Sequence, residues 1–138
     1  MTRTRAILIP LAAIAALVTC SGGDGGGTQA NPTPGTLLVG LTSATSEDGA
    51  ILVTLQGGKM GNLQAARGAI RWSASGDSTQ IKVVLIGSLA TGDLLRLDVP
   101  DIAKVRNYTA TTTQVAGRNN SYALLQTADF DLSVAAAP

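Results

Sequence analysis

Acid pairs are the only groups in this chain whose residue types and spacing could supply acid–base catalysis. The 138 residues include no histidine and a single cysteine, Cys20. This composition excludes Ser-His-Asp and Cys-His catalytic groups, and with them the zinc sites built from histidines or several cysteines. Any chemistry of the chain must therefore come from carboxylates or from that one thiol.

Two acid pairs are close enough in sequence to consider. Glu47 and Asp48 are adjacent in the loop SATSEDG, and Asp129 and Asp131 alternate in the segment DFDLSV. Glycoside hydrolysis needs two carboxylates across a cleft, whereas acids in a turn or on the polar face of one strand are typical of a solvated surface. We predict no catalytic residue and no enzymatic activity.

A second group of acids could bind a cation. Asp93, Asp98 and Asp101 could give oxygen ligands to calcium, as loops do in many β-sandwiches, but their spacing matches no EF-hand loop. We predict no metal-binding residue and no cofactor, and a calcium ion in the loops stays open.

Cys20 lies where an apolar segment ends and a glycine tract begins. Residues 1–5 carry two arginines and no acid, and residues 6–18 form an apolar stretch of 13 residues. That stretch is shorter than the roughly 20 residues of a membrane-spanning helix and has the length of a signal-peptide core. An ordinary secretory signal cut near Ser21 or Gly22 is the alternative to the interpretation that follows.

The segment Leu17-Val18-Thr19-Cys20 resembles the lipobox of bacterial lipoproteins. The resemblance implies that residues 1–19 are a cleaved signal peptide, that diacylglycerol is joined to the Cys20 thiol, and that the new amine is acylated. Thr19 departs from the Gly, Ala or Ser usual before the cysteine. Ser21 follows the cysteine where the inner-membrane retention signal of enteric bacteria has Asp, which implies an outer-membrane location.

Residues 20–35 read as a lipidated cysteine followed by a spacer. The stretch SGGDGGGTQANPTPG has six glycines, two prolines and no large apolar side chain, so burial could not offset the entropy of ordering it. A coil of this length spans on the order of 20 Å. The tract GGDGGG lacks the order GxxxxGK[ST] of a phosphate-binding loop, so we interpret it as a tether.

Residues 36–138 are predicted to form an all-β sandwich of about 7–9 strands, because short apolar–polar alternations are separated by turn residues. Helical turns are expected only at residues 62–67 and 100–104. Trp72, the only tryptophan, alternates with Ile70 and Ala74 and is expected to fill the core between the sheets. The alternative for Trp72 is an exposed platform that stacks on a sugar. The predicted strands are TLLVGL, GAILVTLQ, AIRWSA, STQIKVVLIGS, LRLDV, YTATTTQVA, SYALL and DFDLSV.

The strand layout is similar to that of the cohesin-like, immunoglobulin-type sandwiches of bacterial surface proteins. The similarity is carried by the opening strand PGTLLVGL, the strand GAILVTLQG, the run from Gly87 to Pro100, and the segment Tyr108-Thr-Ala-Thr. It implies a sandwich fold. No cohesin recognition motif is present, so no binding residue carries over.

Charge gives no reason to expect nucleic acid as a partner. Without Arg3 and Arg5 the chain has eight basic and nine acidic residues, a net charge of −1, and its densest basic pair is Lys104 and Arg106.

We expect a lipid-anchored, non-catalytic interaction or assembly module of the cell envelope. It would bind an envelope protein through loops or through a sheet edge that takes an added strand. The alternative is a glycan- or small-ligand-binding module, which an exposed Trp72 would favour. The sequence leaves the oligomeric state open.

Overall fold

The computed structural model describes residues 30–138 except 69 and 122. Cys20, the predicted signal peptide and most of the predicted tether lie outside the described residues. Within them the chain forms eight strands and three short 3-10 helices, and no α-helix. The strands are β1 Gly35–Ser43, β2 Asp48–Gln56, β3 Leu63–Ala65, β4 Arg71–Gly76, β5 Gln80–Ser88, β6 Gly92–Val99, β7 Thr109–Gly117 and β8 Phe130–Ala136; the 3-10 helices are η1 Ile102–Asn107, η2 Arg118–Asn120 and η3 Thr127–Asp129.

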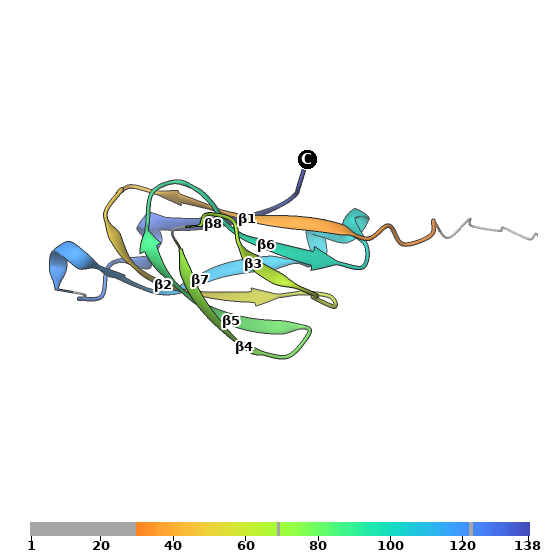
Figure 1. Ribbon diagram of the computed structural model, residues 1–138, viewed down its shortest axis with the longest axis horizontal. Coiled ribbons are helices and arrows are strands. Elements are labelled where there is room, and N and C mark those ends of the chain that lie inside the picture. The colour runs from red at the N-terminus through yellow and green to blue at the C-terminus, as the bar shows by residue number, and fades with distance from the viewer. Residues whose placement is uncertain (1–29, 69, 122) are drawn as a thin grey trace, which may run out of the picture.

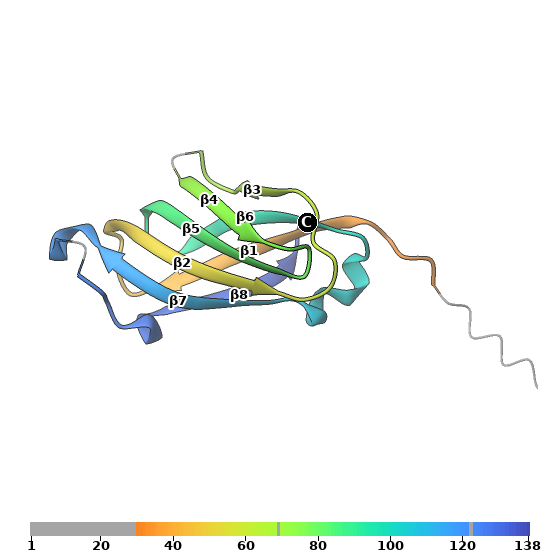
Figure 2. The same ribbon diagram turned by 90° about the horizontal axis from the view of Figure 1, so that it is seen from below.

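The strands make two four-stranded sheets that pack face to face (Figure 1). Sheet A has the order β3-β6-β1-β8 and sheet B has the order β4-β5-β2-β7, and every described strand pair is antiparallel. Figure 2 shows β3 and β4 along one side of the sandwich and β7 and β8 along the other. The predicted all-β sandwich is confirmed.

The core comes from alternate residues of the four central strands, as the period-2 pattern predicts. Each of these side chains is at most 2% exposed, so each gains close to the full burial energy of about 1.5–3 kcal/mol. They are Leu37, Val39 and Leu41 of β1, Ile51, Val53 and Leu55 of β2, Val83 and Leu85 of β5, and Leu95 and Leu97 of β6. This core and all the described strand pairs lie between Gly35 and Ala136.

The prediction of a helical turn at residues 62–67 is wrong. Leu63–Ala65 is a short edge strand that pairs with β6, placing Leu63 opposite Leu97 in the core. Three residues are too few to show a period, so pairing with β6 decides their conformation rather than local preference.

Two other segments differ from expectation in detail. The turn expected at residues 100–104 is η1, which begins after Asp101, whose side chain accepts a hydrogen bond from the backbone N–H of Ala103. The strand expected at SYALL is reduced to one bridge between Leu124 and Ala116. The Leu125 N–H also donates to the Val115 carbonyl at 2.8 Å, so this segment covers the last part of β7 without becoming a strand.

The prediction that Trp72 fills the core is wrong, because its side chain is 42% exposed. Trp72 lies directly opposite Leu85 and therefore does face the inner side of sheet B. However, β4 is the edge of sheet B, and β3, the edge strand of sheet A on the same side, has three residues. Trp72 thus points inward at a place where sheet A offers little cover.

Two neighbouring residues of β5 test this division into core and surface. We expect Leu85→Ala to lower the free energy of unfolding by about 2–5 kcal/mol, since it leaves a cavity in the core. Val84→Ala, on the exposed face of the same strand, should change it by less than about 1 kcal/mol. Urea unfolding followed by circular dichroism measures both. Equal losses for the two variants would contradict the assigned faces.

Candidate functional site

The acids Glu47 and Asp48 hold a loop in place through contacts with the turn after β7. A Glu47 carboxylate oxygen accepts a hydrogen bond from the backbone N–H of Asn119 at 3.1 Å, and Asp48 lies 3.7 Å from the guanidinium of Arg118. The two acids therefore tie the β1–β2 connection to the turn after β7. Both already have partners, which fits their interpretation as surface acids.

Asp129 and Asp131 do not share a strand face. Asp129 belongs to η3, just before β8, and Asp131 lies on the outer face of sheet A opposite Thr42. Both side chains are exposed. Their positions place negative charge at one end of the groove described below.

Two of the three acids considered as calcium ligands, Asp98 and Asp101, are held by separate interactions. Asp98 accepts from the Thr36 hydroxyl at 3.0 Å. Asp101 caps η1, and its carboxylate also lies 3.4 Å from the Lys104 ammonium. Within the described part of the chain, no three acidic, histidine or cysteine side chains are close enough together to hold a metal ion.

Hydrogen bonding lowers the pKa of two acids, Asp101 and Asp77. Desolvation would raise the pKa of Asp101, but hydrogen bonds from the Thr33 and Ala103 backbones and the charge of Lys104 together lower it. The pKa of Asp77 is lowered by the Thr79 backbone N–H, the Thr79 hydroxyl and the Gln80 backbone N–H. Both carboxylates therefore stay ionised at neutral pH and fix turns.

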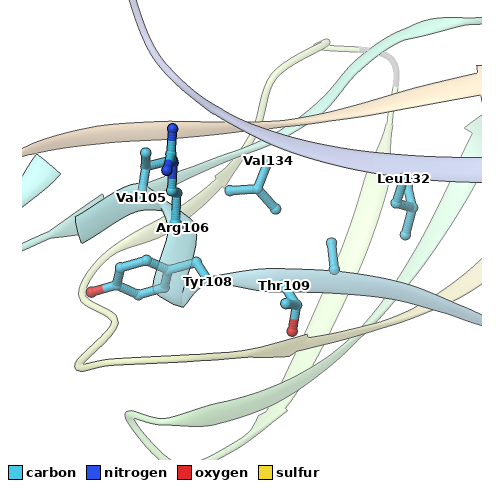
Figure 3. Close-up of a pocket in the computed structure, with 7 residues that line it drawn as sticks. Val105, Arg106, Tyr108, Thr109, Leu132 and Val134 are labelled. Atoms are coloured by element: carbon cyan, nitrogen blue, oxygen red, sulfur yellow. The ribbon is translucent and has the colours of Figure 1, made fainter. Parts of the chain in front are cut away.

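A groove between the edge strands β7 and β8 is here called the seam. One cavity of about 260 Å³ lies at its η1 end, and a second of about 280 Å³ lies farther along. Both have Ala110 and Leu132 in their linings, so the two cavities are neighbours along the seam. Figure 3 shows Leu132 and Val134 projecting from β8, with Tyr108 and Thr109 at the start of β7 and Arg106 on η1.

The seam exists because β7 has small inward-facing residues. Ala110 lies opposite Leu55 and Thr112 opposite Val53, so β7 provides a methyl group and a hydroxyl where its neighbour β2 provides large apolar side chains. As a result Leu132 and Val134 on β8 remain half-buried. The Thr112 hydroxyl donates to the Phe130 carbonyl at 2.7 Å and ties the two edges together at that point.

The edge of β7 is unpaired along much of its length. In the described residues β7 pairs with β2 on one side, and on its other side the segment 124–125 covers Val115 and Ala116. This leaves residues 109–114 as a free edge. The sequence of β7, TATTTQVAG, contains no charge and no proline, which are the residues that usually protect an edge strand from pairing.

The two ends of the seam differ in charge. Arg106 lines the end next to η1, and a second cation, Lys104, is exposed on the same 3-10 helix. At the other end Asp131 lines the second cavity, and a further cavity of about 270 Å³ is lined by Asp129 and Glu47. A bound segment would therefore meet positive charge at one end and negative charge at the other.

A second unusual surface is the outer face of sheet B. Val84, Ile86 and Leu124 are exposed there, and a cavity of about 170 Å³ has Leu52, Val84, Ala116 and Leu124 in its lining. The outer face of sheet A is instead mostly polar, with Gln64, Arg96, Asp98, Asp131 and Ser133. Alternation alone missed this patch, although the unbroken apolar runs AILV and VVLI in β2 and β5 were a visible signal for it.

Comparison with protein-family models, with curated proteins and with solved structures found no match to this chain. The described residues contain no helix long and apolar enough to cross a membrane. The features that bear on function are therefore the seam, the edge strands and the sequence around Cys20.

The hydrogen bond between Thr112 and Phe130 gives a test of how the seam is held. We expect Thr112→Val, which keeps the shape of the side chain, to lower the free energy of unfolding by about 1 kcal/mol. The substitution removes the hydroxyl of β7 that donates to the Phe130 carbonyl. Thr111→Val, on the exposed face of the same strand, should change it by less than about 0.5 kcal/mol. Thermal unfolding compares them, and no difference between the variants would refute the closing role of Thr112.

Proposed function

We propose that this chain is a bacterial lipoprotein that presents a non-catalytic β-sandwich as an interaction module at the cell envelope, on the outer membrane. The observation that carries the proposal is the free, uncharged edge of β7 beside an apolar groove. Exposed edges of this kind bind an extended segment of a partner through backbone hydrogen bonds, while neighbouring pockets select its side chains. The seam provides both parts in one place.

The anchor is proposed from the lipobox resemblance at Cys20 and is compatible with where the sandwich begins. The chain enters the fold through Thr33 and Gly35, next to η1, where the Ile102 N–H donates to the Thr33 carbonyl at 2.8 Å. Figure 1 shows this entry at one end of the long axis. Residues 20–35 would then act as the spacer between lipid and sandwich, with the loop around Leu124 at the far end.

The exposed apolar patch on sheet B gives further support to an interaction role. Ala50 pairs with Ile86 and Leu52 pairs with Val84, so apolar residues of two adjacent strands form one surface. Continuous exposed apolar patches on small proteins are typical of surfaces that contact other proteins. The polar outer face of sheet A does not share this character.

The exposure of Trp72 favours the alternative, a module that binds a glycan or another small ligand. An indole ring that is 42% exposed on an edge strand could stack on the apolar face of a sugar. Trp72 is absent, however, from the linings of the four cavities described above. The seam therefore remains the better-supported binding site.

Metabolic labelling with a fatty-acid analogue tests the anchor. We expect the wild-type chain to be labelled and to sediment with membranes, and Cys20→Ser to lose the label, because the acyl chain requires the thiol and the new amine of Cys20. Equal labelling of the two proteins would refute lipid attachment at Cys20.

Affinity capture from the envelope tests the seam with a matched pair of variants. Ala110→Lys places a charge inside the groove, whereas Thr111→Lys places the same charge on the outer face of the same strand. We expect Ala110→Lys to lose at least about tenfold of the captured partner, because a buried unpaired charge opposes binding, and Thr111→Lys to retain it. Capture unaffected by Ala110→Lys would refute the seam as the binding site. If the wild-type chain recovers only a soluble sugar and Trp72→Ala no longer binds it, the chain is a glycan-binding module instead.

A further inference from the structure

We propose that the segment bound in the seam is β4 of a second copy of this chain, so that sheet B continues from one molecule into the next. This inference rests on the proposed function of the seam as a strand-binding site, and it names the partner. Four properties of β4 and β7 favour their pairing: their directions, their lengths, their inward-facing side chains and the charges at their ends.

Direction is the first property. β4 and β7 are the two edges of the same sheet, and neighbouring strands of that sheet are antiparallel throughout. β4 therefore runs opposite to β7. When β4 of a second copy lies beside β7 in a continuing sheet, the new pair is antiparallel, like the described pairs of the sheet.

Length is the second property. The free edge of β7 covers residues 109–114, and β4 has six residues, Arg71–Gly76. All six residues of β4 are exposed, so the strand is accessible. When Trp72 lies opposite Thr112, residues 71–75 lie beside residues 109–113, where residue 113 is the extra residue of a bulge in β7, and the segment 124–125 stays in place.

Side-chain complementarity is the third property. β7 has too little inward-facing volume, with Ala110 and Thr112, while β4 has Trp72, a large inward-facing side chain that its own molecule leaves 42% exposed. Placing Trp72 opposite Thr112 directs the indole toward the half-buried Leu132 and places Ala74 opposite Ala110. Burial of the indole against the seam removes apolar surface from water on both molecules.

The same register matches the residues of the outer face. Cross-strand neighbours share a face in an antiparallel pair, so Ser73 would lie beside Thr111 and Ser75 beside Thr109. Pairs of serine and threonine hydroxyls across strands stabilise sheets. Arg71 would lie beside Thr113, where no charge of β7 opposes it.

The order of charges is the fourth property. β4 begins with Arg71 and is followed by Asp77, whereas the seam runs from Arg106 at the start of β7 to Asp129 and Asp131 beyond Thr112. In the antiparallel arrangement Asp77 comes to the Arg106 end and Arg71 to the acidic end. A parallel arrangement would bring like charges together at both ends.

The interface is heterologous, because one molecule gives β4 and the other gives β7 and β8. Each molecule keeps one free β4 and one free seam after pairing, so the assembly grows into a ring or a filament rather than stopping at a two-fold dimer. This consequence separates the proposal from any pairing of β7 with β7.

The single tryptophan makes the experiment specific. The experiment uses residues 21–138, which contain every described strand and the single tryptophan of the chain, Trp72. We expect sedimentation velocity to show assembly that grows with concentration, together with a blue shift of the tryptophan emission. Trp72→Ser and Ala110→Lys should each abolish growth beyond the monomer, with association weakened by roughly 30-fold, as expected for loss of a central interface residue. Ser133→Lys, which places the same charge on the exposed outer face of β8, is the control that keeps the seam open.

Mixing the two variants tests the head-to-tail arrangement. Trp72→Ser retains an intact seam, Ala110→Lys retains an intact β4, and the mixture contains tryptophan only in the second protein. We expect a one-to-one heterodimer that grows no further, with emission that shifts to the blue as Trp72→Ser is added. The double variant Trp72→Ser/Ala110→Lys should cause no shift when it is added in place of Trp72→Ser.

Three results would overturn the proposal: a wild-type chain that stays monomeric with unshifted emission at every concentration, assembly that survives Ala110→Lys, or variants that fail to associate when mixed. Folding of each variant is checked by far-ultraviolet circular dichroism, and a variant that fails to fold is replaced by Leu132→Lys for the seam or Trp72→Lys for β4. If the chain is monomeric while envelope capture still depends on Ala110, the second copy is excluded and the proposed function stands. If neither depends on Ala110, both fail.

Discussion

The apolar side chains of the four central strands fill the space between the sheets, and the exposed edges can exist because this core is sufficient without them. β1 and β6 of sheet A face β2 and β5 of sheet B, and their inward residues are almost completely buried. Among the described residues no polar or charged side chain is buried in this core. A dry core of well-packed Leu, Ile and Val gives the domain its stability, since one cysteine cannot form an internal disulfide.

This central core leaves the two sides of the sandwich incomplete in opposite ways. On the β3–β4 side, Trp72 is a large inward-facing residue without enough cover, because β3 has three residues. On the β7–β8 side, Ala110 and Thr112 are small inward-facing residues that leave a groove. A sandwich with large inward-facing side chains along both sides, or with small ones along both sides, would lack this mismatch. The mismatch within one molecule is resolved when two molecules lie side by side.

The alternation of apolar and polar residues predicted most strands because a period of two assigns each side chain to a face directly. It placed Trp72 on the correct face and still led to the wrong conclusion that Trp72 is buried. Burial depends on which strand of the other sheet lies over that face, and this follows from contacts between residues far apart in the chain. The seam could not be predicted for the same reason. An exposed sheet edge was expected, but β7 and β8 are neighbours only because of the order of the strands in the two sheets. The strand Leu63–Ala65 was missed because it is too short for a period to be visible.

The proposed anchor limits which pairing of edges can occur on a membrane. In a sheet that continues from β7 of one molecule to β4 of the next, equivalent strands run in the same direction, so the η1 end and the attached tether lie on the same side in every copy. Antiparallel pairing of β7 with β7 would reverse one molecule and point its tether away from the surface that holds its partner. The proposed lipid attachment would also confine the molecules to a layer, which would raise their effective concentration and let a short edge contact suffice where it would be weak in dilute solution. An edge without protecting charges, which would be a hazard for a freely diffusing protein, is then a property that the anchored protein can use.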